Sequence, residues 1–154
     1  MEYTYNSPVG RLLITYTDSH VTGLCFDKEQ TAAHVQNTAI AQCIKELDEY
    51  FAGTRTAFDV PVRPHGTAFQ MTTWDALTRI PYGTVVSYGH IAREIGKPKA
   101  SRAVGGANNK NPISIIVPCH RVVGAGGKMV GYGGGLWRKE WLLEHEAPIL
   151  QIKA

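Results

Sequence analysis

The pattern of apolar and polar positions makes the first part of the chain strand-rich. Residues 11–16 and 21–26 are rich in β-branched and aromatic side chains, and the polar stretch 17–20 lies between them. This arrangement predicts a hairpin, to which residues 3–6 could add a third strand. Residues 38–51 then follow a helical period, and Gly53 ends the predicted helix. The apolar stripe of this helix comprises Ile40, Cys43, Ile44, Leu47, Tyr50 and Phe51, and the charged residues Lys45, Glu46, Asp48 and Glu49 lie off it.

The rest of the chain is predicted to be mostly helical. A Pro- and Gly-containing stretch, residues 61–66, reads as a linker. Residues 67–80 form an amphipathic pattern, Ser87 is a good N-cap for a helix from residue 88 to 95, and a further helix runs from about 99 to 108. Helix, tight glycine-containing turn and helix is the pattern of a helix-turn-helix. A last helix is expected over residues 136–146.

The candidate chemistry lies where an apolar run ends. Residues 115–117 read as a buried strand that Pro118 should stop, because proline cannot donate to a sheet ladder. Cys119 follows at once, next to His120 and Arg121. Cys119 is either one more small buried apolar side chain or a nucleophile whose thiolate is favoured by a neighbouring base or charge. Adjacent side chains on an extended chain point to opposite faces, so a water between Cys119 and His120 is the simplest route for a proton.

The stretch Val-Pro-Cys-His-Arg-Val at 117–122 resembles the active-site signature of the O(6)-alkylguanine-DNA alkyltransferases, also called methylated-DNA–protein-cysteine methyltransferases. Further matches in the family's order and spacing are Ile-Pro-Tyr-Gly-Thr at 80–84, Ser-Tyr at 87–88, Ser-Arg-Ala-Val-Gly-Gly at 101–106, Asn-Pro at 111–112, Gly-Tyr at 131–132 and Lys-Glu-Trp-Leu-Leu at 139–143. The resemblance is strong from about residue 67 to 146 and weak before it.

The resemblance implies the fold and the reaction. The expected fold is α+β, with a ribonuclease-H-like sheet-plus-helix domain over residues 1–64 and a mostly helical domain with a winged helix-turn-helix over residues 65–154. The implied function is DNA repair: the alkyl group of O6-alkylguanine moves once onto Cys119 after the base is flipped out of the duplex. The resemblance leaves open whether O4-alkylthymine is accepted as well. No metal or other cofactor is expected.

The resemblance also implies roles for individual residues. His120 acts on Cys119 through water, Glu146 orients His120, and Tyr88 donates a proton and helps to rotate the target phosphate. Arg102 enters the duplex in place of the flipped base, and Asn111 tethers the helix-turn-helix to the cysteine region. DNA contacts are expected from Tyr88, Ser101, Arg102, Ala103 and Gly106, and the guanine pocket and its support from Asn111, Arg121, Val122, Tyr132, Gly133 and Gly134. Gly133 departs from relatives with serine there, so only a backbone N–H could serve at that position.

Two of these residues have a plainer interpretation from the residues alone. Arg102 could be an ordinary surface charge. Glu146 shares a helix face with Leu142 and Leu143, so its carboxylate needs a partner, which could be Arg121 in a salt bridge or His120. The predicted second helix of the helix-turn-helix is built from small residues, which favours DNA binding through charge and shape rather than through reading of bases.

Charge and composition narrow the function classes. Residues 1–64 carry five Lys/Arg against eight Asp/Glu, whereas residues 65–154 carry eleven against five, and this asymmetry favours a polyanionic partner for the second part. The three cysteines, Cys25, Cys43 and Cys119, form no disulfide or zinc-ligand spacing. No apolar run is long enough to span a bilayer and no signal peptide is evident. We therefore expect a cytoplasmic protein that binds duplex DNA containing O6-alkylguanine, with no membrane and no obligate protein partner.

Three other functions stay open. A damage-flagging relative would bind lesions without repairing them, but such proteins carry tryptophan in place of the cysteine. A plain helix-turn-helix regulator would bind specific sequences, which the small-residue helix disfavours. A cysteine hydrolase would need an oxyanion hole and turnover, and it leaves the basic helical region unexplained.

Overall fold

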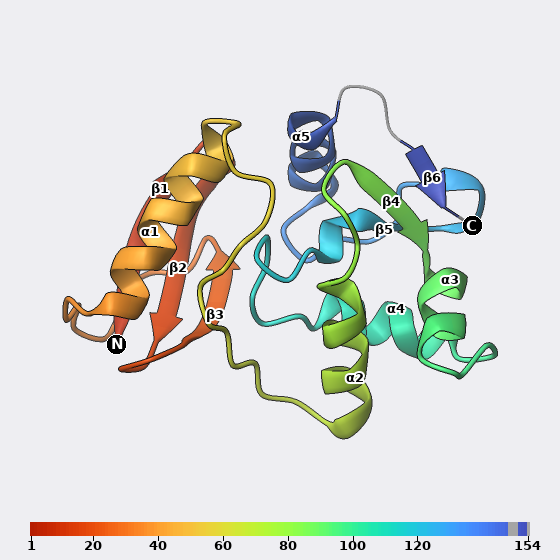
Figure 1. Cartoon of the computed structure of the whole chain (residues 1–154), viewed down its shortest axis with the longest axis horizontal. Coiled ribbons are helices and arrows are strands. Elements are labelled where there is room, and N and C mark those ends of the chain that lie inside the picture. The colour runs from red at the N-terminus through yellow and green to blue at the C-terminus, as the bar shows by residue number, and fades with distance from the viewer. Residues whose placement is uncertain (148–150, 154) are drawn as a thin grey trace. The chain divides into compact units, whose positions relative to one another are not determined.

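The computed structural model describes residues 1–147 and 151–153, which separate into two compact units, Met1–His65 and Gly66–Ala154. The first unit begins with the antiparallel strands β1 (Glu2–Ser7), β2 (Gly10–Tyr16) and β3 (Val21–Phe26), in the sheet order β1-β2-β3 (Figure 1). Helix α1 (Thr38–Phe51) follows and is capped by Asn37, whose side chain accepts from the Ile40 N–H. The predicted hairpin, third strand and helix are therefore confirmed.

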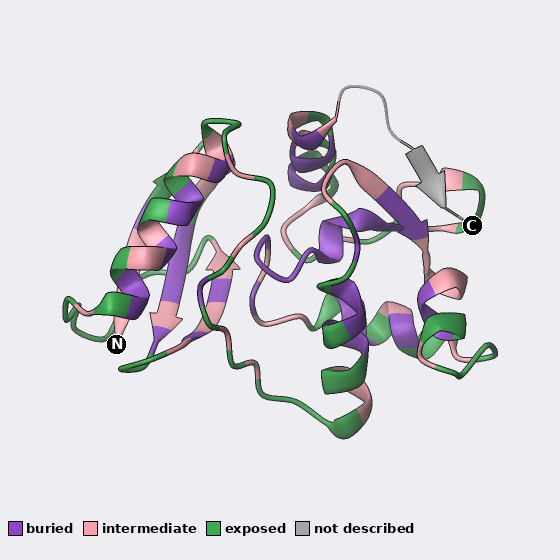
Figure 2. Cartoon of the chain, in the orientation of Figure 1, coloured by how far each residue is buried: buried purple, intermediate pink, exposed green. Residues whose placement is uncertain are grey.

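The core of the first unit lies between this sheet and α1. Strand β2 is buried along most of its length, as Figure 2 shows. Leu12, Ile14 and Leu24 of the sheet and Ile40 and Leu47 of α1 are fully buried. The predicted stripe of α1 is confirmed at its centre, because these residues recur at helical spacing on one face.

Glu46 is an exception to the predicted pattern, because it lies off the apolar stripe and yet is only 2% exposed. One carboxylate oxygen accepts the backbone N–H groups of Asp59 and Val60, at 2.8 and 3.0 Å. The other accepts from Gln42 and lies 3.9 Å from the Arg55 guanidinium. Since burial of an unpaired charge is expensive, these partners explain why Glu46 can face inward. The loop that supplies them could not be placed from periodicity.

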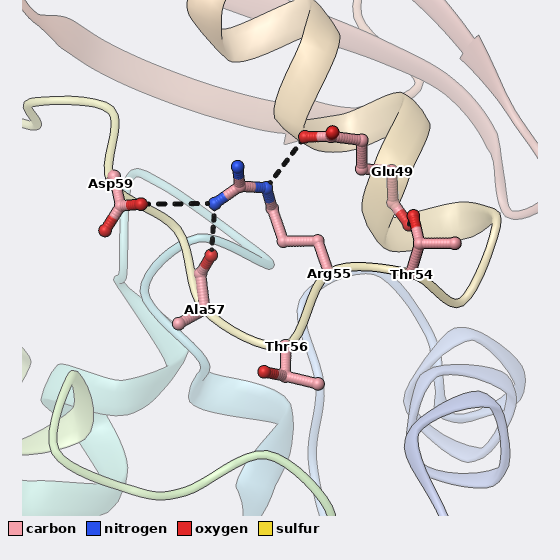
Figure 3. A pocket seen from close by; sticks show the side chains of 6 residues that line it. All are labelled: Glu49, Thr54, Arg55, Thr56, Ala57 and Asp59. Atoms are coloured by element: carbon pink, nitrogen blue, oxygen red, sulfur yellow. Dashed lines mark hydrogen bonds and ion pairs between the residues drawn. The ribbon is translucent and has the colours of Figure 1, made fainter.

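Arg55 lines a hollow of about 280 Å³ in the first unit, together with Glu49, Thr54, Thr56, Ala57 and Asp59. Figure 3 shows the guanidinium reaching from the loop toward α1. It donates to Glu49 at 3.0 Å, to the Ala57 carbonyl at 2.7 Å and to Asp59 at 3.3 Å. These bonds engage the guanidinium with the protein itself, so we interpret Arg55 as a tie between α1 and the loop that follows it.

The second unit is mostly helical and carries a small parallel sheet. Helix α2 (Ala68–Leu77) begins at a capping box formed by Thr67 and Gln70, β4 (Thr84–Ser87) leads into α3 (Tyr88–Glu94), and α4 (Ser101–Asn109) follows a short turn. The last helix is α5 (Leu136–Glu146). Strands β5 (Val122–Val123) and β6 (Gln151–Lys153) pair in parallel with β4, in the order β5-β4-β6.

The fold is therefore α+β, as predicted, and Ser87 caps α3 as predicted, accepting from the His90 N–H. Strands β4 and β6 were not anticipated, because a four-residue and a three-residue strand carry too little alternation to be recognised. Within the described residues no helix is long and apolar enough to cross a membrane.

The prediction of a strand over residues 115–117 is wrong. Residues 114–116 form a turn, Val117 is a bend, Ile115 has φ +72°, and Cys119–Arg121 form the short 3-10 helix η1. The Asn111 amide bonds the backbone at both ends of this segment, accepting from the Ile113 N–H at 3.0 Å and donating to the Val117 carbonyl at 2.8 Å. These local bonds replace a sheet ladder while the isoleucine side chains stay buried. The inference that the Cys119 and His120 side chains point to opposite faces of an extended chain is therefore also wrong, because both residues lie in η1.

Candidate active site

Cys119 lies at the start of η1, immediately after the turn that Asn111 closes. The Cys119 N–H donates to the Val117 carbonyl at 2.8 Å, and the Cys119 carbonyl accepts the N–H of Val122. The residue is only 4% exposed. The thiol is therefore fixed by the backbone of a tight turn and is shielded from bulk water.

Burial raises the pKa of the Cys119 thiol, whereas the side chains of Asn111 and Tyr132 and the charge of Lys139 act in the opposite direction. Desolvation prevails, because a charged sulfur is disfavoured where water cannot reach it. The resting thiol is therefore protonated at neutral pH, and a nucleophilic thiolate requires a base to remove the proton.

A buried network of His120, Arg121 and Glu146 lies beside the cysteine. His120 Nε2 lies 2.7 Å from Glu146 Oε2, and the Arg121 guanidinium donates to both carboxylate oxygens, at 2.8 and 3.0 Å. A third Arg121 bond, at 2.8 Å, reaches the Ile80 carbonyl after α2. Both partners left open for Glu146 are thus present at once. The two leucines of the same helix face, Leu142 and Leu143, are buried with it, as the sequence predicted.

The charges in this network divide the roles of its members. Burial alone would raise the pKa of Glu146, but the pairing with His120 and with Arg121 outweighs it and holds that pKa well below its usual range. Burial lowers the pKa of His120, against the raising effect of Glu146. We therefore take Glu146 as ionised and His120 as neutral, which is the form able to accept a proton. Within the described part of the chain, His120 Nδ1 is buried and has no hydrogen-bond partner.

Lys139 is a functional candidate that the sequence reasoning missed. It sits in α5 with none of its surface exposed, and its ammonium donates to the Val122 carbonyl at 2.6 Å and the Val130 carbonyl at 3.0 Å. Burial lowers the pKa of Lys139 to about 8, and a negative charge on Cys119 raises it. A buried lysine would have been identifiable only from its place on the inner face of α5, because lysine is usually a surface residue.

The predicted DNA contacts lie mainly on the outer face of α4. Arg102, Ala103 and Gly106 are exposed, and Ser101 is half-buried at the start of the helix. Gly105 is half-buried, and a Cβ there would lie in ordinary contact with the Tyr88 ring at 3.9 Å. The small residues therefore leave an open outer surface on α4.

Tyr88 joins this outer face to the cysteine. Its side chain is half-buried, and burial, followed by the charge of Cys119, raises the pKa of its hydroxyl. It also lines a hollow of about 510 Å³ together with Ser87, Gly89, Arg93, Ser101, Gly124, Ala125 and Gly126. The start of α4 and the loop after β5 thus lie on either side of one opening, with the Arg93 guanidinium among its polar groups.

The glycine-rich loop after β5 brings Tyr132 next to the cysteine. Burial raises the pKa of the Tyr132 hydroxyl well above its usual value, and the charge of the nearby Cys119 adds to this effect. Gly133 is exposed and Gly134 is half-buried. The buried Arg138 guanidinium donates to the Gly134 carbonyl at 2.9 Å and lies 4.7 Å from the ring centre of Trp137.

The structure therefore gathers Cys119, His120, Arg121, Asn111, Tyr132 and Glu146 around one buried centre, and places Arg102, Ala103 and Gly106 on an outer surface. Val122 is fully buried in β5, where its carbonyl accepts from Lys139. Besides Lys139, sequence reasoning missed Arg138 and the buried Asn108 of α4. The spacing of apolar and polar residues around these two positions does not distinguish them from surface polar residues.

Comparison with known proteins gives a consistent result. The profile described as "6-O-methylguanine DNA methyltransferase, ribonuclease-like domain" matches residues 1–64, and that described as "6-O-methylguanine DNA methyltransferase, DNA binding domain" matches residues 68–148. The methylated-DNA–protein-cysteine methyltransferase of Methanosarcina acetivorans is 46% identical over 148 residues, which cover 92% of this chain and 95% of that protein. Its counterpart from Mycobacterium leprae is 47% identical over 146 residues, covering 92% and 88%.

Solved structures agree with the sequence matches. The crystal structure of Mycobacterium tuberculosis O6-methylguanine methyltransferase aligns with a TM-score of 0.86 at 46% identity, covering 96% of this chain and 92% of that one. The crystal structure of Mycobacterium tuberculosis OGT in complex with DNA aligns with a TM-score of 0.86 at 48% identity, covering 94% and 91%.

Proposed function

Because this chain belongs to the 6-O-methylguanine DNA methyltransferase family, we propose that it repairs DNA by moving the alkyl group of O6-alkylguanine onto Cys119. The observation that carries the proposal is the position of the buried cysteine beside a histidine whose Nε2 is engaged by Glu146 while its Nδ1 makes no hydrogen bond within the described residues. A shielded thiol and a base held in one orientation are what an alkyl acceptor needs.

The first step is removal of the thiol proton. His120 Nδ1 takes it through a water molecule, and the imidazolium that forms is stabilised by Glu146 at 2.7 Å. Arg121 keeps the carboxylate ionised and fixed, since its guanidinium bonds both oxygens. The Lys139 ammonium then stabilises the new thiolate across the site.

The second step is an in-line displacement at the alkyl carbon. The Cys119 sulfur forms a new S–C bond while the C–O6 bond breaks, and the bonding pair remains with the guanine. The developing negative charge on the base is neutralised by a proton that Tyr88 donates near N3. The half-buried hydroxyl of Tyr88 is close enough to the cysteine for its pKa to respond to the charge on the sulfur.

The reacting carbon is out of reach inside a duplex, so the target base must leave the stack. We assign Arg102, exposed on α4, to the space that the base vacates, and Ser101, Ala103 and Gly106 to the adjoining backbone. Tyr88 lies between this surface and the cysteine, which suits a residue that turns the target phosphate. We assign the guanine pocket and its support to four residues: Val122, Tyr132, Gly133 and Gly134. O4-alkylthymine is a second candidate substrate, because its alkyl carbon is also bonded to an exocyclic oxygen of the base and could be displaced in the same way.

The product limits the protein to one reaction. A thioether does not undergo the hydrolysis that releases an acyl or phosphoryl group, and the proposed steps leave no activated water to attack it. Each molecule should therefore repair one lesion.

The test is a stoichiometric titration. A fixed amount of protein is mixed with an excess of duplex containing one O6-methylguanine, and restored guanine is counted by nucleoside mass spectrometry. The proposal predicts a plateau at one repaired base for each protein molecule. Repair well beyond one equivalent would show turnover and contradict acceptance by the protein, and no repair with retained lesion binding would indicate a damage-flagging role.

A further inference from the structure

Asn108 is a buried polar residue to which the proposed reaction gives no task. It lies in the last turn of α4 and is 2% exposed. Its side-chain amide donates to the Cys119 carbonyl at 3.3 Å. One residue of the helix that carries the candidate DNA surface thus bonds directly to the backbone of the candidate alkyl acceptor.

The orientation of this amide has a consequence for its other end. Only the NH2 group can face the Cys119 carbonyl, because the opposite orientation would set two acceptors against each other. Asn108 Oδ1 therefore points elsewhere, and in the part of the chain that the structure describes this buried atom has no hydrogen-bond partner. A buried acceptor left unpaired destabilises the folded state.

The hydrogen bond is also not required by the carbonyl that receives it. The Cys119 carbonyl already accepts the N–H of Val122 within the 3-10 turn. An apolar side chain of similar shape at position 108 would therefore leave no new unpaired group and would remove one. On grounds of stability alone, leucine should be at least as good as asparagine.

The inner end of α4 is fixed at a second point. The Trp74 indole of α2 donates to the Ala107 carbonyl at 2.8 Å, and both residues are buried. The outer face of the same short helix carries Arg102, Ala103 and Gly106. Because a helix of nine residues moves as one body, a hydrogen bond at its inner end can set how far the outer face stands from the cysteine.

We propose that Asn108 is a positioning residue that couples α4 to Cys119, holding the thiol in register with the base that α4 helps to extrude. This inference rests on the proposed function. Displacement of a reacting group by about 1 Å can cost on the order of 100-fold in rate. The amide is therefore retained for the alignment of two surfaces, against a local loss of stability.

The test uses Asn108→Leu and, as a matched control, Asn109→Leu at the exposed neighbouring position of the same helix. Each variant and the wild type are measured for single-turnover methyl transfer from saturating O6-methylguanine duplex, for duplex Kd, and for Tm. We expect Asn108→Leu to slow transfer about tenfold or more, with Kd within about twofold and Tm equal or higher. Asn109→Leu should transfer at the wild-type rate.

A second readout separates alignment from damage to the thiol itself. Alkylation of Cys119 by iodoacetamide, followed by peptide mass mapping, needs no DNA and no helix register. We expect it to be unchanged in Asn108→Leu. If alkylation falls as much as transfer, Asn108 acts on the reactivity of the thiol and the coupling is refuted. Asn108→Ala, measured well below its own Tm, applies the same criteria if leucine overfills the site.

The remaining outcomes also decide. Transfer at the wild-type rate in Asn108→Leu overturns the inference, and so does a loss of transfer that parallels a lower Tm, because that is the mark of a structural tether. Failure of the wild-type protein to transfer methyl groups would instead refute the proposed function, so the two failures are distinguishable in one series.

Discussion

Replacement of Lys139 by methionine tests the electrostatics of the buried centre in a way that can be worked out in advance. Methionine keeps most of the apolar stem of the side chain and removes the ammonium, with its charge and its hydrogen bonds to the Val122 and Val130 carbonyls. The pKa of Lys139 falls from 10.5 to about 8 in the folded protein. Since one pKa unit corresponds to about 1.4 kcal/mol, the folded state disfavours the charged form by about 3 kcal/mol.

The sign of the pH dependence follows from proton counting. Between pH 8 and 10.5 the unfolded chain binds the Lys139 proton more tightly than the folded one, so stability rises with pH in this window. Above pH 10.5 Lys139 is neutral in both states, and the folded state then pays no cost for burying its charge. This gain in unfolding free energy is lost as the pH falls through about 8, where Lys139 is protonated in the folded state as well. From pH 7.5 to 9.5, the wild type should gain about 2 kcal/mol relative to Lys139→Met.

The assay is urea unfolding of both proteins at pH 7.5, 8.5 and 9.5, with the difference in unfolding free energy plotted against pH. Taking the difference removes the titration of groups common to both. Lys110→Met, at an exposed position, controls for the loss of one positive charge. A difference that stays flat across this range, in a variant that folds, would refute the account of a buried ammonium held by two carbonyls.

Three further results are expected. Glu146→Gln leaves Arg121 buried without its counter-charge, so urea unfolding should show a free energy of unfolding lower by about 3–5 kcal/mol. Methyl transfer by this variant should fall at least tenfold, and a folded variant with wild-type transfer would contradict the role of Glu146. Because the Glu146 pKa is held low in the folded state, wild-type stability should decline as the pH falls below about 4.5, and a smaller decline is expected in Glu146→Gln, measured by acid titration of the circular dichroism signal. Arg93 lines the hollow beside Tyr88, and we expect it to contact a DNA phosphate there. Arg93→Ala should then weaken duplex binding in fluorescence anisotropy titrations and reduce the slope of log K against log salt by about 1. An unchanged slope would show that Arg93 does not contact the DNA.

The helices and the first sheet could be predicted because each has a strong local signal. Thr38–Phe51 repeats its apolar residues over four turns, and Ser87 stands at the position where a cap is needed. The pairing of Glu146 with His120 and Arg121 was foreseeable for a different reason. A carboxylate that shares a face with Leu142 and Leu143 must find a buried partner.

The segment before the cysteine could not be predicted by the same means. A run of isoleucine and valine is equally consistent with a buried strand and with a buried turn, and the choice is made by Asn111, whose amide bonds the backbone at both ends of the run. Lys139, Asn108 and Glu46 were missed because each is polar and buried. The partners that make their burial tolerable are carbonyls, N–H groups and side chains brought close only by the tertiary fold.

The central claim is that Cys119 itself becomes the alkyl acceptor. The most direct measurement is peptide mass mapping of the protein after reaction with one equivalent of duplex containing O6-methylguanine, with Cys119→Ser treated in parallel. The account predicts a gain of one methylene mass on the peptide that contains Cys119, and none on the peptides of Cys25 or Cys43. A methyl group on either of those cysteines, repair of the DNA without any gain in protein mass, or continued repair by Cys119→Ser would contradict it.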